Sequence, residues 1–185
     1  MADVRRVLND IAVNESAAAE VVRGLSDWQL NWQQVPGKSW SVAQTLDHIA
    51  LTNSIYVDAM LKAVEAAPRP TRMWSGRIEA GFFGRKFIEN LEPPVKRLKL
   101  KAPEEIIPAS RKAAEEVLAA LTASHEGIRR VIDLSTGMDL NEITFVNPFA
   151  RLLRPRLGTG LQILMAHERR HLWQASNIRQ AALSA

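Results

Sequence analysis

The chain has 185 residues, of which 46% are hydrophobic and 24% are charged, a composition that suits one globular domain, residues 1–185, with a sizeable core. It contains no cysteine, which excludes disulfides, thiolate ligands and a cysteine nucleophile, so any metal must be held by nitrogen and oxygen. The 24 basic and 20 acidic residues give a net charge of +4, too weak an excess to favour nucleic acid as a partner.

The N-terminal segment MADVRRVLNDIAVNESAAAE lacks the apolar core of a signal peptide. No stretch approaches the roughly 20 apolar residues that a membrane-spanning helix needs. We therefore predict a cytoplasmic protein without a membrane segment, and the absence of cysteine agrees with a reducing compartment.

The first helix is predicted over residues 3–25, where apolar residues recur on one side at helical spacing. A second helix is predicted to begin at Ser41. Ser41 followed three residues later by Gln44 is a capping-box pattern, in which the serine oxygen accepts an otherwise unpaired backbone N–H. This helix ends before the sequence AAPRP.

A proline-rich connector spans residues 68–108 and contains a candidate short helix at residues 81–88. Loops this long inside a domain are usually functional or lie over the rest of the domain, so we expect it to cover one side of the protein. The third helix is predicted over residues 110–134. An irregular segment, residues 137–157, precedes the fourth helix at residues 159–182.

Four helices joined by one long connection predict an all-α fold, specifically an antiparallel four-helix bundle with a long crossover connection between helices 2 and 3. Residues 143–146 are the only candidate strand. In an up-and-down order, the second and fourth helices would run parallel.

His167 and His171 lie four residues apart within the sequence HERRH. Four residues are just over one helical turn, so both imidazoles leave the same face of the fourth helix. That face also carries apolar residues, and the pair is therefore expected to point into the protein. Two inward imidazoles can bind one divalent cation; the alternative is two core histidines that find hydrogen-bond partners.

The sequence HERRH also matches the H-E-x-x-H pattern of zinc peptidases. Those enzymes need a third ligand downstream, either a carboxylate or a histidine about six residues later. Position 177 is asparagine, and neither aspartate nor glutamate follows His171. The protease interpretation therefore fails on ligand count.

His48 is the candidate for the third ligand. It lies about as far into the second helix as His167 lies into the fourth, and in parallel helices equal offsets give equal depth. The alternative is a histidine at the surface or edge of its helix.

Two further residues have open interpretations. His125 falls on the apolar face of the third helix and is either a fourth ligand or, as we favour, a hydrogen-bonded core histidine. For Glu168 we favour a structural role, or a hydrogen bond to a metal ligand, over catalysis; Arg129 and Arg130 are candidate partners.

Three neutral histidines leave coordination positions open, and such a site polarises a substrate oxygen or lowers the pKa of a bound water or thiol. Zinc, nickel and iron all suit imidazole ligands. The sequence names no protein side chain as the general base.

The sequence Trp40-Ser41-Val42 before a helix, His48 within that helix, and HERRHLWQA in the last helix resemble the DinB/YfiT-like superfamily, in its DinB_2 branch. SDWQLNW, LEPPVKRLKLKAP and VNPF extend the resemblance over nearly the whole chain. It implies a four-helix bundle, often a homodimer, with a metal triad that maps onto His48, His167 and His171.

The resemblance also implies candidate reactions. Some members use small thiols such as bacillithiol or mycothiol, and others are described as metal-dependent hydrolases. We therefore predict a metal-dependent enzyme, a small-thiol S-transferase or a hydrolase, with a divalent transition metal and a small-molecule substrate. The alternative is a non-catalytic metal-binding or ligand-binding stress-response protein.

Overall fold

The computed structural model describes residues 2–68, 76–94, 102–108 and 111–185. The four long helices are α1 (Val4–Val22), α3 (Val42–Ala66), α5 (Ala114–Leu134) and α6 (Leu157–Leu183). The short elements are α2 (Asp27–Leu30), α4 (Phe82–Leu91), the 3₁₀ helix η1 (Glu104–Ile106), and an antiparallel pair of two-residue strands, β1 (Ala2–Asp3) and β2 (Arg77–Ile78). The all-α prediction is confirmed.

The observed helix boundaries differ from the predicted ones by a few residues. The short helix expected at residues 81–88 is α4, and α6 begins slightly before the predicted start. The expected start of the third helix, Ser110, lies outside the described residues. In the segment predicted as a candidate strand, Thr144 forms one isolated bridge with Arg156, while the short strands β1 and β2 were not expected.

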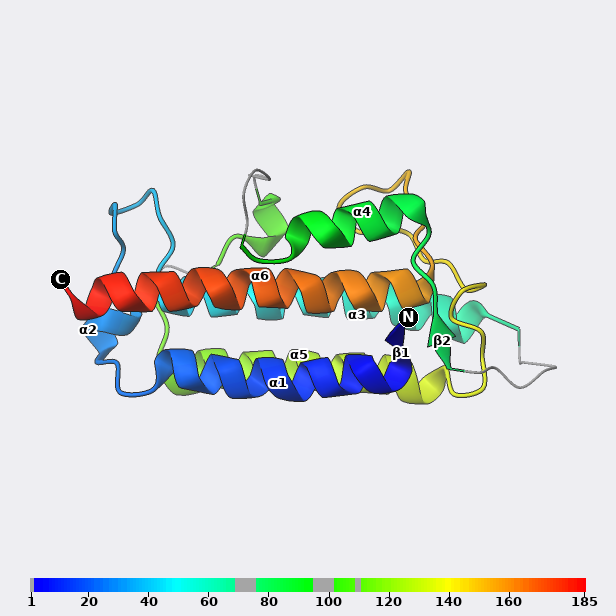
Figure 1. Cartoon of the computed structure of the whole chain (residues 1–185), viewed down its shortest axis with the longest axis horizontal. Helices are drawn as coiled ribbons and strands as arrows, with labels where there is room; N and C mark the ends of the chain where they lie inside the picture. The colour runs from blue at the N-terminus through cyan, green and yellow to red at the C-terminus, as the bar shows by residue number, and fades with distance from the viewer. Residues whose placement is uncertain (1, 69–75, 95–101, 109–110) are drawn as a thin grey trace.

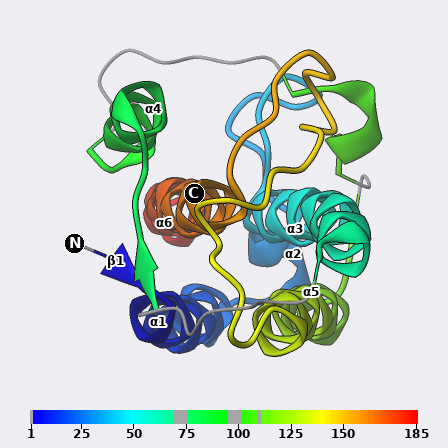
Figure 2. The same cartoon turned by 90° about the vertical axis from the view of Figure 1, so that its right-hand side faces the viewer.

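The four long helices lie side by side, with α1 next to α5 and α6, and α3 next to the same two helices (Figures 1 and 2). One core cluster joins the first halves of α1 and α6 to the second halves of α3 and α5. A second cluster joins the opposite ends. It follows that α1 and α6 run parallel, that α3 and α5 run parallel, and that the two pairs point in opposite directions.

The expectation that the second and fourth long helices run parallel is therefore wrong, because α3 and α6 are antiparallel. The physical reason is the connection over residues 67–113. Within it, α4 packs along α6 (Figure 1), and the chain returns to the end of the molecule where α3 began before α5 starts. A short turn would have reversed the chain direction at this point.

The start of α3 is fixed by the predicted capping box. The Ser41 hydroxyl accepts a hydrogen bond from Gln44 N at 3.2 Å, and the Gln44 side chain accepts one from Ser41 N at 3.1 Å. Substituting an N-cap of this kind typically costs about 1 kcal/mol. The cap sets where the helix begins, and thereby the direction in which His48 leaves it.

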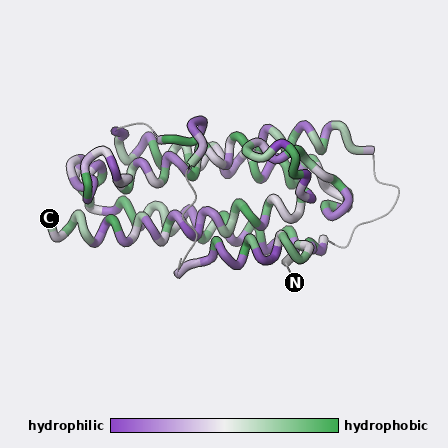
Figure 3. Tube along the Cα trace, turned by 90° about the horizontal axis from the view of Figure 1, so that it is seen from above, coloured by the Kyte–Doolittle hydropathy of each residue, from purple (hydrophilic) through white to green (hydrophobic). Residues whose placement is uncertain are grey.

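Hydrophobic and hydrophilic residues alternate along the long helices (Figure 3), and the apolar ones meet in the two core clusters. The loop before α6 contributes Phe145, whose ring is 2% exposed and closes the cluster over α3 and α6. Among the described residues, no helix is long and apolar enough to cross a membrane.

Gly160 allows the Phe145 ring to pack directly on α6. A Cβ at this position would lie 2.5 Å from Phe145 Cε1 and 2.6 Å from Met60 Cε. We expect Gly160→Ala to lower the free energy of unfolding by about 1–3 kcal/mol, the usual cost of overpacking a core, as measured by urea denaturation. Ser176→Ala, on the exposed face of the same helix, is the control and should stay within about 0.5 kcal/mol. Equal effects of the two substitutions would contradict this packing.

Candidate metal centre

Three histidines from two helices meet between α3 and α6. His48 belongs to α3, and His167 and His171 belong to α6. One ring nitrogen from each lies within 4.8 Å of those of the other two. The structure therefore brings together the three residues that the sequence singled out, and the group can hold a metal ion.

The histidines converge for a different reason from the one expected. Because α3 and α6 are antiparallel, equal offsets from the helix starts do not give equal depth. The His48 ring lies 4.6 Å from that of His171 and 5.2 Å from that of His167 between centroids. The lateral packing of α3 on α6 therefore sets the convergence.

Hydrogen bonds fix the orientation of two of the rings. His48 Nδ1 donates to the Ile106 carbonyl oxygen at 2.8 Å, and His171 Nδ1 contacts Gln174 Oε1 at 3.1 Å. A carbonyl oxygen only accepts, so each Nδ1 carries the hydrogen and each neutral ring keeps a lone pair on Nε2. Histidines that bind metals almost always donate their second nitrogen in this way.

One ring nitrogen of His167 has no hydrogen-bond partner in the protein. Its Nδ1 is buried without a hydrogen-bond partner, although the residue as a whole is partly exposed. Buried polar atoms are normally paired. An unpaired imidazole nitrogen beside two other imidazoles fits the coordination of a divalent cation.

Burial keeps the three rings neutral. Loss of solvation lowers the pKa of His48, and it lowers that of His167 well below its usual value, where the neighbouring histidines add to the effect. The pKa of His171 falls to about 3, chiefly through burial and then through the charges of His48 and Arg170. Neutral imidazoles are the form that binds metal, so the site is ready for a cation at neutral pH.

Glu168 lies next to His167 in sequence but belongs to a separate buried network. Its carboxylate accepts hydrogen bonds from Asn14 Nδ2 at 2.7 Å, Asn53 Nδ2 at 2.8 Å and His125 Nε2 at 3.0 Å. The side chain is buried in the middle of the four long helices. These contacts support the structural role that the sequence favoured, and the partners are not the arginines named there as candidates.

His125 is confirmed as a hydrogen-bonded core histidine and does not join the three-histidine group. Its second nitrogen contacts Glu15 at 3.1 Å, and Glu15 in turn pairs with Arg129 at 3.0 Å. Burial alone would lower the pKa of His125, but the hydrogen bond and charge of Glu168, together with Glu15, raise it above its usual value.

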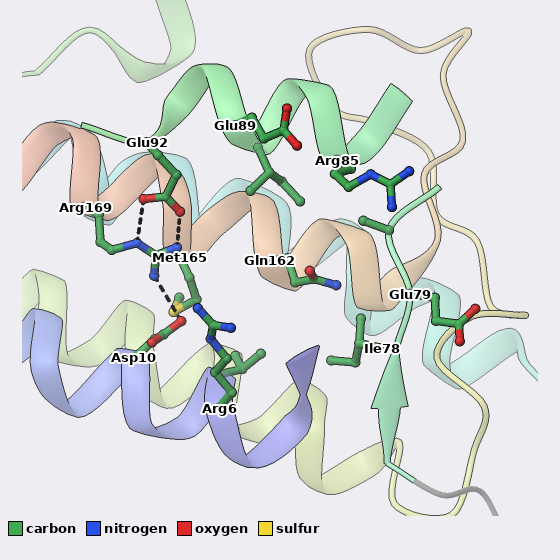
Figure 4. Close-up of a pocket in the computed structure, with 13 residues that line it drawn as sticks. Arg6, Asp10, Ile78, Glu79, Arg85, Glu89, Glu92, Gln162, Met165 and Arg169 are labelled. Atoms are coloured by element: carbon green, nitrogen blue, oxygen red, sulfur yellow. Dashed lines mark hydrogen bonds and ion pairs between the residues drawn. The ribbon is translucent and has the colours of Figure 1, made fainter. Parts of the chain in front are cut away.

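Two cavities flank the helices that carry the histidines. One, of about 540 Å³, is lined by Ile55 and Ala59 of α3 and by the loop before α6; both residues lie on the flank of α3 that carries His48. The other, of about 490 Å³, lies among α1, β2, α4 and α6 (Figure 4). None of the three histidines lines either cavity. Beside the second cavity, Arg169 pairs with Asp10 and Glu92, tying α6 to α1 and to the end of α4.

The fold and the site thus define an all-α protein with a partly enclosed group of three neutral histidines able to hold a metal ion. The family model DinB_2, described as the DinB superfamily, matches residues 11–175. The chain therefore belongs to the DinB superfamily, as its sequence motifs predicted. No curated protein and no solved structure gives a significant match.

Some contributors to the site were not found from the sequence. Gln174 follows His171 at helical i+3 spacing, a signal that sequence reasoning could have used. The Ile106 carbonyl comes from the long connection, and no local pattern predicts its approach to His48. Asn14 and Asn53 were missed because polar residues inside a helical stripe resemble exposed ones in sequence.

The depressed pKa of His171 predicts a pH dependence of stability in the metal-free protein. Above pH 6.5 the ring is neutral in both states; below it, only the unfolded chain binds the proton until the pH nears 3. As the pH falls from about 6 to 4, the free energy of unfolding of wild type should decrease by ~1.4 kcal/mol per pH unit more than that of His171→Gln. Urea denaturation with a chelator measures this difference, and parallel pH profiles would show that the imidazole is not buried in its neutral form.

Proposed function

We propose that this protein is a metal-dependent enzyme that binds one divalent transition metal, zinc, nickel or iron, through His48, His167 and His171. The observation that carries the proposal is the meeting of three neutral imidazole nitrogens within 4.8 Å. Two of the rings are oriented by hydrogen bonds through Nδ1. Membership of the DinB superfamily supports the same ligands.

The proposed reaction is either the transfer of a small thiol to an electrophilic substrate or the hydrolysis of such a substrate. When bound, the cation supplies the positive charge that lowers the pKa of a thiol or water and so produces a nucleophile at neutral pH. The Ile106 carbonyl and Gln174 hold the tautomers that leave ring nitrogens free. Glu168 is not proposed as the general base, because three donors already occupy its carboxylate.

An open site favours catalysis over a purely structural metal. His167 is partly exposed, and Ile55, one of the residues that line the 540 Å³ cavity, lies seven residues or about 10 Å along α3 from His48. A cavity of this volume is large enough for a small-molecule substrate. A structural metal site would instead be closed by four protein ligands.

The finer architecture and the surroundings belong to the same proposal. We interpret the four long helices as a four-helix bundle in which residues 67–113 form the crossover connection. Assembly as a homodimer and a cytoplasmic location stay predictions from the sequence. Phe82 and Phe83 of α4, which are 62% and 86% exposed, support association through that helix.

Metal titration of the purified chain tests the ligand set. We expect wild type to bind about one zinc or nickel ion per chain, and His48→Ala, His167→Ala and His171→Ala each to weaken binding more than tenfold. His125→Gln is the matched control, because it removes a buried histidine outside the group and should leave metal affinity unchanged. Wild-type affinity in all three alanine variants would exclude the site.

A panel of small thiols, each paired with an alkylating or epoxide electrophile, tests the reaction. The metal-loaded protein is expected to accelerate consumption of at least one thiol, or hydrolysis of an ester or amide in its absence. His48→Ala, which lacks the proposed metal site, is the control for background reaction. Metal binding without acceleration of any pair would favour the alternative, a non-catalytic metal-binding or ligand-binding protein.

A further inference from the structure

The hydroxyl group of Thr52 in α3 makes no hydrogen bond within the protein. The side chain is 4% exposed, and its Oγ1 is buried without a hydrogen-bond partner. Among the described residues, it is the only hydroxyl group in that condition. Buried polar groups without partners are costly and rare, and each calls for an explanation.

Other hydroxyl groups of α3 donate a hydrogen bond to a backbone carbonyl oxygen of the preceding turn. Thr45 Oγ1 donates to the Ser41 carbonyl oxygen at 2.7 Å, and Ser54 Oγ donates to the Ala50 carbonyl oxygen at 2.9 Å. Bonding to the preceding turn is the common pattern for such residues. The hydroxyl of Thr52 does not adopt it and is left with a hydrogen to donate elsewhere.

The packing of α3 on α6 locates this hydroxyl. Asn53 Nδ2 donates to Glu168 Oε1 at 2.8 Å, and the His48 and His171 rings lie 4.6 Å apart. His48 is thus level with His171, and Asn53 is level with Glu168. Moving toward the C-terminus of α3 therefore means moving toward the N-terminus of α6. By this antiparallel register, Thr52 lies at about the level of Glu168, within about one residue of His167.

His167, the ring with the unpaired Nδ1, directly precedes Glu168, and its ring lies 5.2 Å from that of His48 between centroids. Thr52 also follows His48 by four residues, so the two side chains leave the same flank of α3. One turn further along this flank, Ile55 begins the 540 Å³ cavity. Along this flank of α3, Thr52 therefore lies between His48 and Ile55, which lines the cavity.

We propose that Thr52 is a positioning residue that donates a hydrogen bond to the small molecule held at the three-histidine site. Its ligand is an acceptor: an oxygen, or an anionic group, of the substrate that enters from the cavity beside Ile55. The inference rests on the proposed function for the presence of a bound substrate. It explains why a hydroxyl is kept where the fold would be better served by a methyl group.

Cobalt(II) and azide make the proposal measurable without a known substrate. Cobalt(II) suits imidazole ligands, and azide is a small anion whose binding to it is followed by visible absorption. Thr52→Val keeps the shape and removes the donor. We expect it to bind cobalt(II) as wild type does but to bind azide about tenfold more weakly, the effect of losing one hydrogen bond to a charged group.

Thr45→Val is the matched control. It removes a buried hydroxyl that the fold uses, so the metal-free variant should melt at a lower temperature than wild type and bind azide normally after loading. Metal-free Thr52→Val should melt at or above the wild-type temperature, because an unpaired buried hydroxyl is replaced by a methyl group.

Three results would overturn the role of Thr52. Unchanged azide affinity in Thr52→Val shows that the hydroxyl does not reach the bound molecule. A lower melting temperature like that of Thr45→Val shows that the fold uses the group after all. Weaker cobalt binding by Thr52→Val shows that it acts on the metal ligands instead. Absence of cobalt binding by wild type is a separate outcome, which removes the proposed function and this inference with it.

Discussion

The antiparallel contact between α3 and α6 is the constraint on which the site depends. The buried hydrogen bond from Asn53 to Glu168 fixes the position of α3 along α6. In the same register, His48 packs against His171. A carboxylate in the middle of the protein fixes this register strongly, because a shift of one helix along the other would leave it buried without its donors. The hydrophobic contacts on either side tolerate such a shift more easily, since apolar packing has little directional preference.

In this arrangement, the adjacent residues His167 and Glu168 of α6 have different roles. His167 faces the flank of α3 that carries His48, while Glu168, about 100° further around the helix, faces the interior and accepts hydrogen bonds from α1, α3 and α5. The sequence HERRH therefore has a different meaning from its use in peptidases. There the glutamate acts on water beside the metal; in this protein it holds four helices together so that the histidines on two of them meet.

The sequence predicted the helices and the three histidines well, because both leave local signals. Apolar periodicity, the Ser41 capping box and the i, i+4 spacing of His167 and His171 need no knowledge of the remaining chain. Helix direction was not predictable in the same way. It depends on the path of residues 67–113, and the assumed parallel pairing of the second and fourth helices was wrong even though the ligands it selected come together. The Ile106 carbonyl, which orients His48 from 58 residues away, likewise leaves no local pattern.

Among the described residues, the buried polar atoms without a hydrogen-bond partner include Thr52 Oγ1, Asn53 Oδ1 and His167 Nδ1, all in α3 and α6. Asn14, His125 and the Nδ2 of Asn53 all bond to the Glu168 carboxylate in the middle of the helices, although the Oδ1 of Asn53 has no partner. His167 Nδ1 and Thr52 Oγ1 are likewise not satisfied, and both residues lie close to His48, one by ring packing and the other by the helical i+4 spacing. Polar groups left unpaired by folding cost stability, and two of them at one place between the same two helices indicate a site whose partner comes from outside the chain. Glu168, whose carboxylate accepts three hydrogen bonds, belongs to the scaffold, whereas the unpaired hydroxyl of Thr52 supports the proposed contact with a ligand.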